Sequence, residues 1–170
     1  MEKEKIIVRI FCDYIATLAQ GIWDYPLYCD DDHKSGYRYF EDYCTLCEDD
    51  VVILNDLIYW NMEFDRYYFD FYLALMNNEL FEEKCFDPDT FTETGKKLAF
   101  RLKLNHPEWE IQFYDEIADD IATFSNKETE NTCETTHWYS VHISSTMTPL
   151  FLPLSKRRDG DGSWEYYLAD

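Results

Sequence analysis

The stretch from Phe40 to Phe64 constrains the fold most, because its apolar residues recur every three or four positions. Eight side chains share this spacing: Phe40, Tyr43, Cys44, Cys47, Val51, Leu54, Ile58 and Met62. Side chains three and four positions apart lie on the same face of an α-helix. The spacing therefore predicts a helix over residues 40–64 that buries this stripe in the core.

Acidic residues occupy the opposite side of the same predicted helix. They are Glu41, Asp42, Glu48, Asp49, Asp50, Asp56, Glu63 and Asp65, and no Lys or Arg lies between Arg38 and Arg66. Like charges at i,i+4 spacing destabilise a helix by about 0.2–0.5 kcal/mol per pair. A face of unrelieved negative charge therefore indicates a use outside the fold.

The composition indicates one folded and very acidic domain. The chain has 170 residues, of which 46% are hydrophobic and 18% aromatic, so residues 1–170 can bury one sizeable core. Its net charge of −20 would repel nucleic acid and anionic membranes and attract a basic partner. The charge is concentrated, because residues 24–50 contain nine acids and two bases, and residues 108–134 contain nine acids and one base. This concentration favours a binding surface.

Local patterns predict the remaining elements. Strands are indicated at 6–14, 109–114, 136–144, 149–154 and 163–168, and helices at 66–84 and 115–124. Asp87-Pro88 is a start signal for a helix that ends near residues 105–107. Residues 27–39 are polar and aromatic and are predicted to form a surface loop. Together these elements predict a single-domain α+β fold, with an antiparallel or mixed sheet and about three or four helices packed on one face.

A pattern of aromatic and acidic residues extends over residues 6 to about 114. It consists of Phe11-Cys12-Asp13-Tyr14, Gly21-Ile22-Trp23-Asp24, the helix end from Trp60 to Phe64, and Phe91, Gly95 and Leu98 before the strand at 109–114. This pattern resembles a small family of uncharacterised bacterial proteins, and the resemblance implies no enzyme activity. In its size and acidity the chain is also similar to the immunity proteins of bacterial toxin systems.

Four residues would allow a zinc site, namely Cys29, His33, Cys44 and Cys47. Cys44 and Cys47 form a Cys-x-x-Cys pair, which is a spacing found among zinc ligands. Both also lie on the predicted apolar stripe, where cysteine behaves as a small hydrophobic residue. A core role is therefore preferred, no cofactor is expected, and a metal-binding enzyme is kept as the less favoured alternative.

Histidine and serine residues lie close together near the C-terminal strands without forming a catalytic motif. His137 and His142 flank Ser140, but their odd spacing predicts that the two histidines lie on opposite faces of a strand. The chain also lacks the Gly-x-Ser-x-Gly elbow of the α/β-hydrolases. We therefore expect a protein that is not an enzyme.

Acidic residues interleaved with aromatic residues predict the binding surface, because interfaces combine aromatic centres with charged rims. The predicted partner-contacting residues are Asp30, Asp31, Asp32, Tyr37, Tyr39, Glu41, Asp42, Glu48, Asp49, Asp50, Asp115, Glu116, Asp119 and Asp120.

Two functions fit a surface of this kind. The first is an immunity protein that neutralises a basic bacterial toxin, most simply a nuclease, by binding it. The alternative is a DNA mimic of the antirestriction or anti-CRISPR type. The chain shows neither a signal peptide nor about 20 consecutive apolar residues, so we expect a cytoplasmic protein that binds neither membranes nor nucleic acid directly.

Overall fold

The computed structural model describes residues 7–12, 27–30, 37–39, 48–77, 79, 86–125, 136–158 and 164–168. These residues form three helices and seven strands, in the following order: β1 (Ile7–Ile10), β2 (Leu27–Asp30), β3 (Tyr37–Tyr39), α3 (Glu48–Asn77), α4 (Pro88–Asn105), β4 (Glu110–Tyr114), α5 (Glu116–Ser125), β5 (Trp138–Ile143), β6 (Pro149–Arg158) and β7 (Trp164–Leu168).

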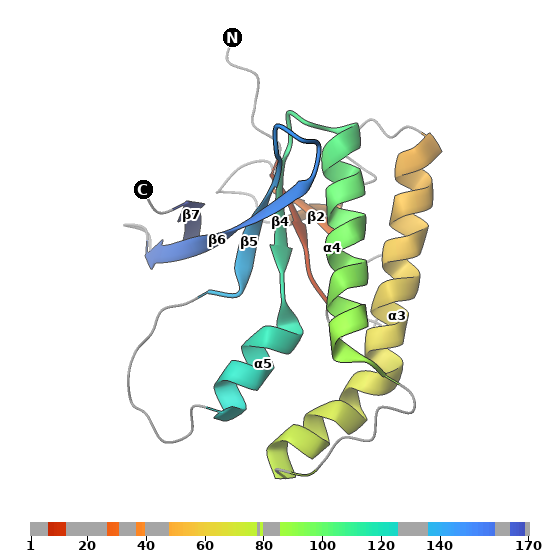
Figure 1. Cartoon of the computed structure of the whole chain (residues 1–170), viewed down its shortest axis with the longest axis vertical. Coiled ribbons are helices and arrows are strands. Elements are labelled where there is room, and N and C mark those ends of the chain that lie inside the picture. The colour runs from red at the N-terminus through yellow and green to blue at the C-terminus, as the bar shows by residue number, and fades with distance from the viewer. Residues whose placement is uncertain are drawn as a thin grey trace.

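The strands form one curved mixed sheet in the order β3-β2-β1-β4-β5-β6-β7 (Figure 1). Every neighbouring pair is antiparallel except β1 and β4, which run parallel with Val8 opposite Ile111. A parallel pair requires a long crossover connection, and here the chain between β1 and β4 includes α3 and α4. The predicted α+β fold with a mixed sheet is confirmed.

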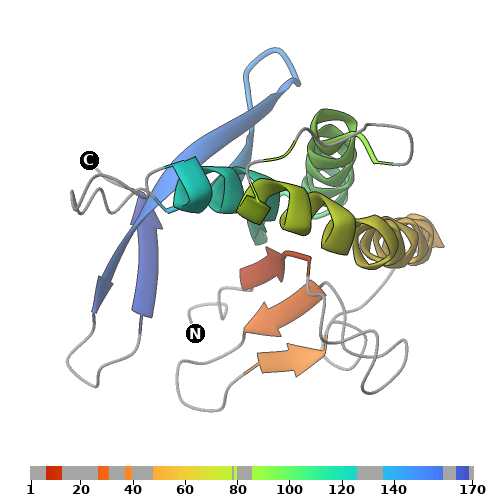
Figure 2. The same ribbon diagram turned by 90° about the horizontal axis from the view of Figure 1, so that it is seen from below.

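The three described helices gather on one face of the sheet (Figure 2). Helix α4 packs on β4 and β5, α3 packs beside α4, and α5 contacts α3. The central strands turn Val8, Ile10, Ile111 and Phe113 towards these helices, and each of the four is at most 1% exposed. The strand predicted at 109–114 is confirmed, but it is buried on both faces at its centre, because Gln112 is only 1% exposed. None of the described helices is long and apolar enough to cross a membrane.

Helix α4 begins where the sequence predicted. Asp87 caps it, because one carboxylate oxygen accepts hydrogen bonds from the backbone amides of Asp89 and Thr90 at 3.1 and 3.3 Å. Pro88 occupies the first helical position, where its missing N–H and fixed φ are tolerated. The hydrogen bond from the Thr90 hydroxyl is the largest cause that lowers the pKa of Asp87.

Residues 27–39 contain two strands, so the prediction of a surface loop was wrong. β2 pairs with β1, and β3 pairs with β2 with Asp30 opposite Tyr37. The acidic run after Leu27 and the glycine at position 36 favoured a loop, but ladder hydrogen bonds are made by the backbone and do not require apolar side chains. An accessible edge of β1 is therefore enough to order short polar strands.

Helix α3 differs from the prediction in its extent and in its rotation. It runs without interruption to Asn77, whereas residues 40–47 of the predicted helix lie outside the described residues. Ile53, Leu57, Trp60, Asn61 and Phe64 form the most deeply buried part of its inner face, each at most 4% exposed. Val51 and Met62 of the predicted stripe are instead 47% and 50% exposed, whereas Leu54 is buried as predicted. The helix rotates to bury the rings of Trp60 and Phe64, because large aromatic side chains remove much apolar surface from water.

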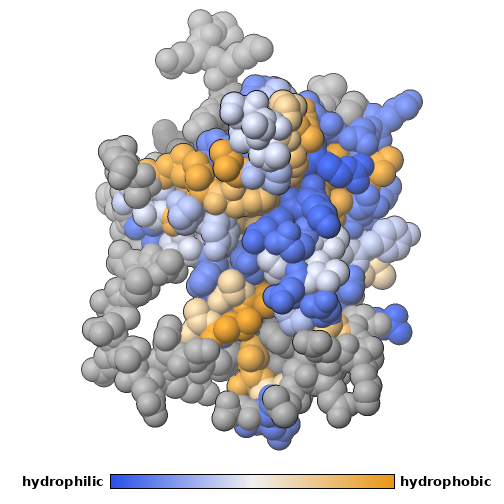
Figure 3. All heavy atoms as spheres, viewed as in Figure 1, coloured by the Kyte–Doolittle hydropathy of each residue, from blue (hydrophilic) through white to orange (hydrophobic). Residues whose placement is uncertain are grey.

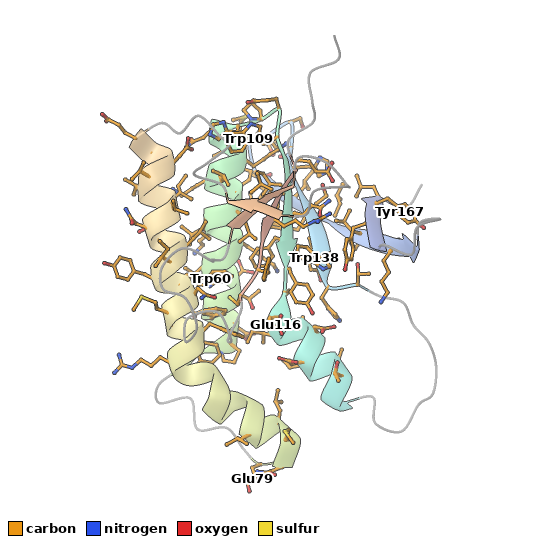
Figure 4. The ribbon with its side chains drawn as sticks, turned by 180° about the vertical axis from the view of Figure 1, so that it is seen from behind. Trp60, Glu79, Trp109, Glu116, Trp138 and Tyr167 are labelled. Carbon is orange, nitrogen blue, oxygen red and sulfur yellow. The ribbon has the colours of Figure 1, made fainter. Side chains whose placement is uncertain are left out.

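Trp60 is the centre of the contact between α3, α4 and β4 (Figure 4). Its ring stacks on Phe91 with 4.8 Å between centroids and lies 6.0 Å from the ring of Phe113. Its indole Nε1 donates a hydrogen bond to the carbonyl oxygen of Phe91 at 2.9 Å, so the polar atom of this buried side chain is satisfied.

Candidate functional site

The outer face of α3 carries large apolar side chains that the domain leaves in contact with water. Tyr59 is 70% exposed, Met62 50%, Val52 49% and Val51 47%. These residues lie on the side of α3 opposite the buried Leu57 and Trp60. In Figure 4 the side chains on this side of α3 project away from the rest of the domain.

These exposed residues follow a seven-residue repeat. Val52, Tyr59, Arg66 and Leu73 are seven positions apart and all exposed, and Asn55, Met62 and Met76 form a second exposed line with the spacing of such a repeat. A repeat of two lines with an average step of 3.5 residues is the pattern of a helix seam that packs against another helix. We call these residues, from Val52 to Met76, the α3 stripe.

Carboxylates border the α3 stripe at the same interval. Asp49, Asp56 and Glu63 are seven positions apart, and Asp70 continues the spacing in the sequence. Arg101 of α4 bridges the first two, with its guanidinium nitrogens 3.2 Å from Asp49 Oδ1 and 3.1 Å from Asp56 Oδ2. The side chains of Asp49 and Asp56 remain 53% and 45% exposed. We call Asp49, Asp56 and Glu63 the acidic edge.

Ion pairs as exposed as those of Arg101 contribute about 0.2–1 kcal/mol each to stability, so their main effect here is to orient the carboxylates. One guanidinium faces two aspartates, and Glu63 is a further exposed carboxylate of the edge. The acidic edge therefore keeps a net negative charge beside the apolar stripe.

Asp50 was predicted to contact a partner, and the structure corrects this prediction because the residue is fully buried. Its Oδ2 lies 2.8 Å from His106 Nε2, and its Oδ1 accepts a hydrogen bond from Asn105 Nδ2 at 3.0 Å. The His106 ring stacks on Trp109 with 3.5 Å between centroids. A buried carboxylate requires such hydrogen bonds, so Asp50 joins the first turn of α3 to the end of α4. Sequence reasoning had no local signal for this long-range contact.

Asp115 was also predicted to contact a partner, and it is only 7% exposed. It precedes α5, and its Oδ1 accepts hydrogen bonds from the Ala118 backbone amide at 3.1 Å and from the Thr92 hydroxyl at 3.4 Å. The Asp-x-x-Ala spacing at the start of the helix is that of an N-cap. Asp115 therefore caps α5 and fastens it to α4.

The three acids that follow Asp115 are half-buried rather than freely exposed. Asp119 accepts a hydrogen bond from the Tyr114 hydroxyl at 2.7 Å, and burial together with this bond raises the pKa of Tyr114. Asp120 Oδ2 is buried without a hydrogen-bond partner among the described residues, and burial raises the pKa of Asp120 to about 6. Glu116 is half-buried at the start of α5. This cluster therefore offers less free charge than its sequence suggests.

The other predicted contact residues divide into three groups. Glu48 and Asp49 are exposed in the first turn of α3, as predicted. For Asp30, Tyr37 and Tyr39 the structure describes the strand backbone but not the side chains. The rest lie outside the described residues, namely Asp31, Asp32, Glu41 and Asp42, and stay predictions.

The sheet face turned away from the helices carries a polar and aromatic network. Arg9 Nε donates to Gln112 Oε1 at 3.0 Å, and Gln112 Nε2 donates to Glu110 Oε1 at 2.6 Å. Trp138 stacks on Tyr114 with 5.0 Å between centroids. Gln112 is only 1% exposed, and these two hydrogen bonds satisfy its side-chain amide within the protein.

Ser140 and His142 lie on this same sheet face, with 2.8 Å between Ser140 Oγ and His142 Nε2. Burial lowers the pKa of His142, Lys103 lowers it further, and Glu110 acts in the opposite direction. Ser140 is 4% exposed, and a nucleophile has to reach its substrate. The burial of the hydroxyl therefore favours a structural role for the pair.

The described residues contain no group of three or more His, Cys, Asp or Glu side chains that could hold a metal ion. This finding does not test the zinc site considered from the sequence, because His33, Cys44 and Cys47 lie outside the described residues and the side chain of Cys29 is not described. Cys12 is a buried thiol in the core.

A second exposed apolar area lies over β6, where Figure 3 shows hydrophobic side chains gathered. Leu150 and Leu152 are 44% and 38% exposed. The same strand ends in the basic run from Lys156 to Arg158. The apolar area of β6 therefore belongs to a basic strand, whereas the α3 stripe is bordered by acids.

Comparison with known proteins adds no relative to these observations. No family model, no curated protein and no solved structure matches the chain.

Proposed function

We propose that this protein is a non-enzymatic inhibitor that binds a basic protein partner in the cytoplasm, most simply an immunity protein that neutralises a nuclease-type bacterial toxin. The observation that carries the proposal is the outer face of α3, where exposed apolar side chains lie beside carboxylates at regular spacing. A contiguous exposed apolar surface rimmed by polar residues is typical of a protein-binding site.

The two parts of this surface have different roles in binding. Tyr59, with 70% of its surface in water, supplies a large rigid anchor of the kind that dominates interface energetics. The acidic edge and the net charge of −20 attract a basic partner over longer distances and raise the association rate. Fast capture is what an inhibitor of a toxin requires.

The spacing of the acids favours a protein partner over mimicry of DNA. Residues seven positions apart on a helix are separated by about 10.5 Å along its axis. Duplex DNA carries one charge per about 1.7 Å of its axis. The acidic edge is therefore several times sparser than the phosphates it would have to imitate, and a phosphate mimic has no use for the apolar stripe.

The test is capture of partners by the tagged protein from its source at low and at high salt, followed by a toxin-protection assay with the recovered partner. We expect a basic protein that is lost at high salt. Recovery of no basic protein, or of one whose binding is insensitive to salt, would contradict the proposal. Displacement of several unrelated enzymes by plain duplex DNA would instead support the DNA mimic.

Charge reversals then locate the interface. Glu63→Lys on the acidic edge is compared with Glu93→Lys, which makes the same charge change at an exposed position of α4. A third variant reverses Asp30, Asp31 and Asp32 together and tests the acidic cluster predicted from the sequence. The variant at the true interface is expected to slow association most, because exposed rim charges act mainly by steering.

A further inference from the structure

We infer that the docking element of the partner is an amphipathic α-helix with a row of Lys or Arg, which packs along α3 with its apolar side on the α3 stripe and its cations against the acidic edge. This inference rests on the proposed function and names the chemistry of the partner at the same site.

The geometry of the α3 stripe selects a helix as the occupant. From Val52 to Arg66 the stripe covers 15 residues, which is about four turns and about 21 Å of helix axis. Its two lines repeat every seven residues, and a second helix presents side chains with the same rise and repeat. An extended strand, with about 3.3 Å per residue and a period of two, does not keep step with this spacing.

The straight part of α3 is accessible along the length that such a contact needs. Figure 1 shows α3 straight over its first two thirds and bent in its last third. Exposure is high at Val52, Asn55, Tyr59 and Met62, which all lie in the first half of α3 in the sequence. The central contact is therefore expected there, with Tyr59 in the middle.

Charge selects a basic helix. The carboxylates of the acidic edge directly follow the second line of the stripe: Asp56 follows Asn55, Glu63 follows Met62, and Asp49 lies seven positions before Asp56. In a pair of packed helices, residues at this flanking position form ion pairs with the neighbouring helix. Lysines or arginines seven positions apart on the partner would meet these carboxylates in turn. A second copy of this chain is disfavoured, because each copy carries −20 and the same acidic edge.

Polar residues in the stripe favour one register. Asn55 and Arg66 interrupt the apolar residues at positions that face the partner. Polar groups at seam positions reduce the affinity of a helix pair and favour the alignment that satisfies them. A partner with a hydrogen-bonding residue opposite Asn55 would fit best.

The first test uses two synthetic peptides of identical composition. One has leucines in a seven-residue repeat flanked by lysines, and the other has the same residues in an order without the repeat. Titration against the full chain, followed by calorimetry, is expected to show tighter binding of the peptide with the repeat. Equal affinity for both peptides would overturn the inference, because it would show that binding depends on the net charge of the peptide and not on the seven-residue repeat.

Matched variants then locate the peptide. Tyr59→Ala and Met62→Ala are expected to weaken binding at least about fivefold, as truncation of central interface residues does. Leu104→Ala removes an apolar side chain that is 39% exposed on α4 and is expected to change affinity less than about twofold. Equal losses in Met62→Ala and Leu104→Ala would place the peptide elsewhere and overturn the inference.

The natural partner separates this inference from the proposed function. If the tagged protein captures a salt-sensitive basic partner and Tyr59→Ala still binds it fully, the inhibitor proposal stands and the helix-docking inference is wrong. If the protein captures no basic partner, the proposed function itself fails. If the captured partner is lost in Tyr59→Ala and competes with the heptad peptide, both are supported.

Discussion

Gly95 of α4 lies directly against the indole ring of Trp60 on α3. A Cβ atom added at Gly95 would lie 2.4 Å from Trp60 Cζ2 and 2.9 Å from Phe113 Cε2. Two helices and the central strand β4 therefore meet at one point where no side chain fits. This close approach allows Trp60 to enter the core, and it sets the rotation of α3 that places Tyr59 in water.

Gly95→Ala is expected to lower the free energy of unfolding by about 1–3 kcal/mol, which is the usual cost of overpacking a core. Alanine is the better helix former by about 1 kcal/mol, but the atoms that it meets belong to rigid buried rings. Urea denaturation measures the difference, with Lys97→Ala at an exposed position of α4 as the control. A stabilised Gly95→Ala variant would show that the three elements can separate at little cost.

Truncations on the two faces of α3 test its rotation. Leu57→Ala is expected to cost about 2–5 kcal/mol, since Leu57 is fully buried. Met62→Ala is expected to change stability by less than about 0.5 kcal/mol, since its side chain is half in water. Thermal or urea unfolding of both variants provides the comparison. A larger loss of stability in Met62→Ala than in Leu57→Ala would indicate that α3 buries the stripe predicted from the sequence.

Asp50 and Asp49 are neighbours in the sequence, but their truncation is expected to lower stability by very different amounts. Asp50→Ala is expected to destabilise the protein by about 3–5 kcal/mol, because it leaves His106 Nε2 without its buried carboxylate and leaves Asn105 only its exposed hydrogen bond to Asp49. Asp49→Ala, which breaks exposed contacts, should cost less than about 1 kcal/mol. Chemical denaturation of both variants measures the two losses of stability. Equal losses would contradict the structural role of Asp50.

Asp120→Asn is expected to raise the melting temperature at neutral pH and to leave it unchanged in acid. The pKa of Asp120 is about 6 in the folded protein and about 3.9 in an unfolded chain, so ionisation disfavours the folded state. This destabilisation is absent below about pH 4, grows between about pH 4 and 6, and is complete above that range. The gain should be small because Asp120 is half-exposed.

Melting curves of Asp120→Asn across this pH range provide the measurement. Glu93→Gln removes the same charge from an exposed position of α4 and serves as the control. A melting-temperature difference between Asp120→Asn and the unaltered protein that does not vary with pH would show that Asp120 stays ionised or is solvated in the folded state.

Features that depend on neighbouring residues could be read from the sequence. The cap at Asp87-Pro88, the end of α4 near Asn105, and the strand that carries Ile111 and Phe113 all follow from local chemistry and periodicity. The acidic charge and the exposed carboxylates of the first turn of α3 could also be predicted. These signals lie within a few residues of one another, so no knowledge of the fold is needed to interpret them.

The choice of the buried face of α3 depended on the tertiary structure. The sequence of α3 contains two overlapping apolar stripes, one from Val51 to Met62 and one through Leu57 and Phe64, and Leu54 at their border is buried in the structure. Periodicity alone does not rank the two stripes. The space opened by Gly95 and lined by Phe91 and Phe113 accepts Trp60, and this long-range fit buries the second stripe. The same rotation buries Asp50 and leaves Tyr59 exposed, so the candidate binding surface exists because of packing between residues that are far apart in the chain.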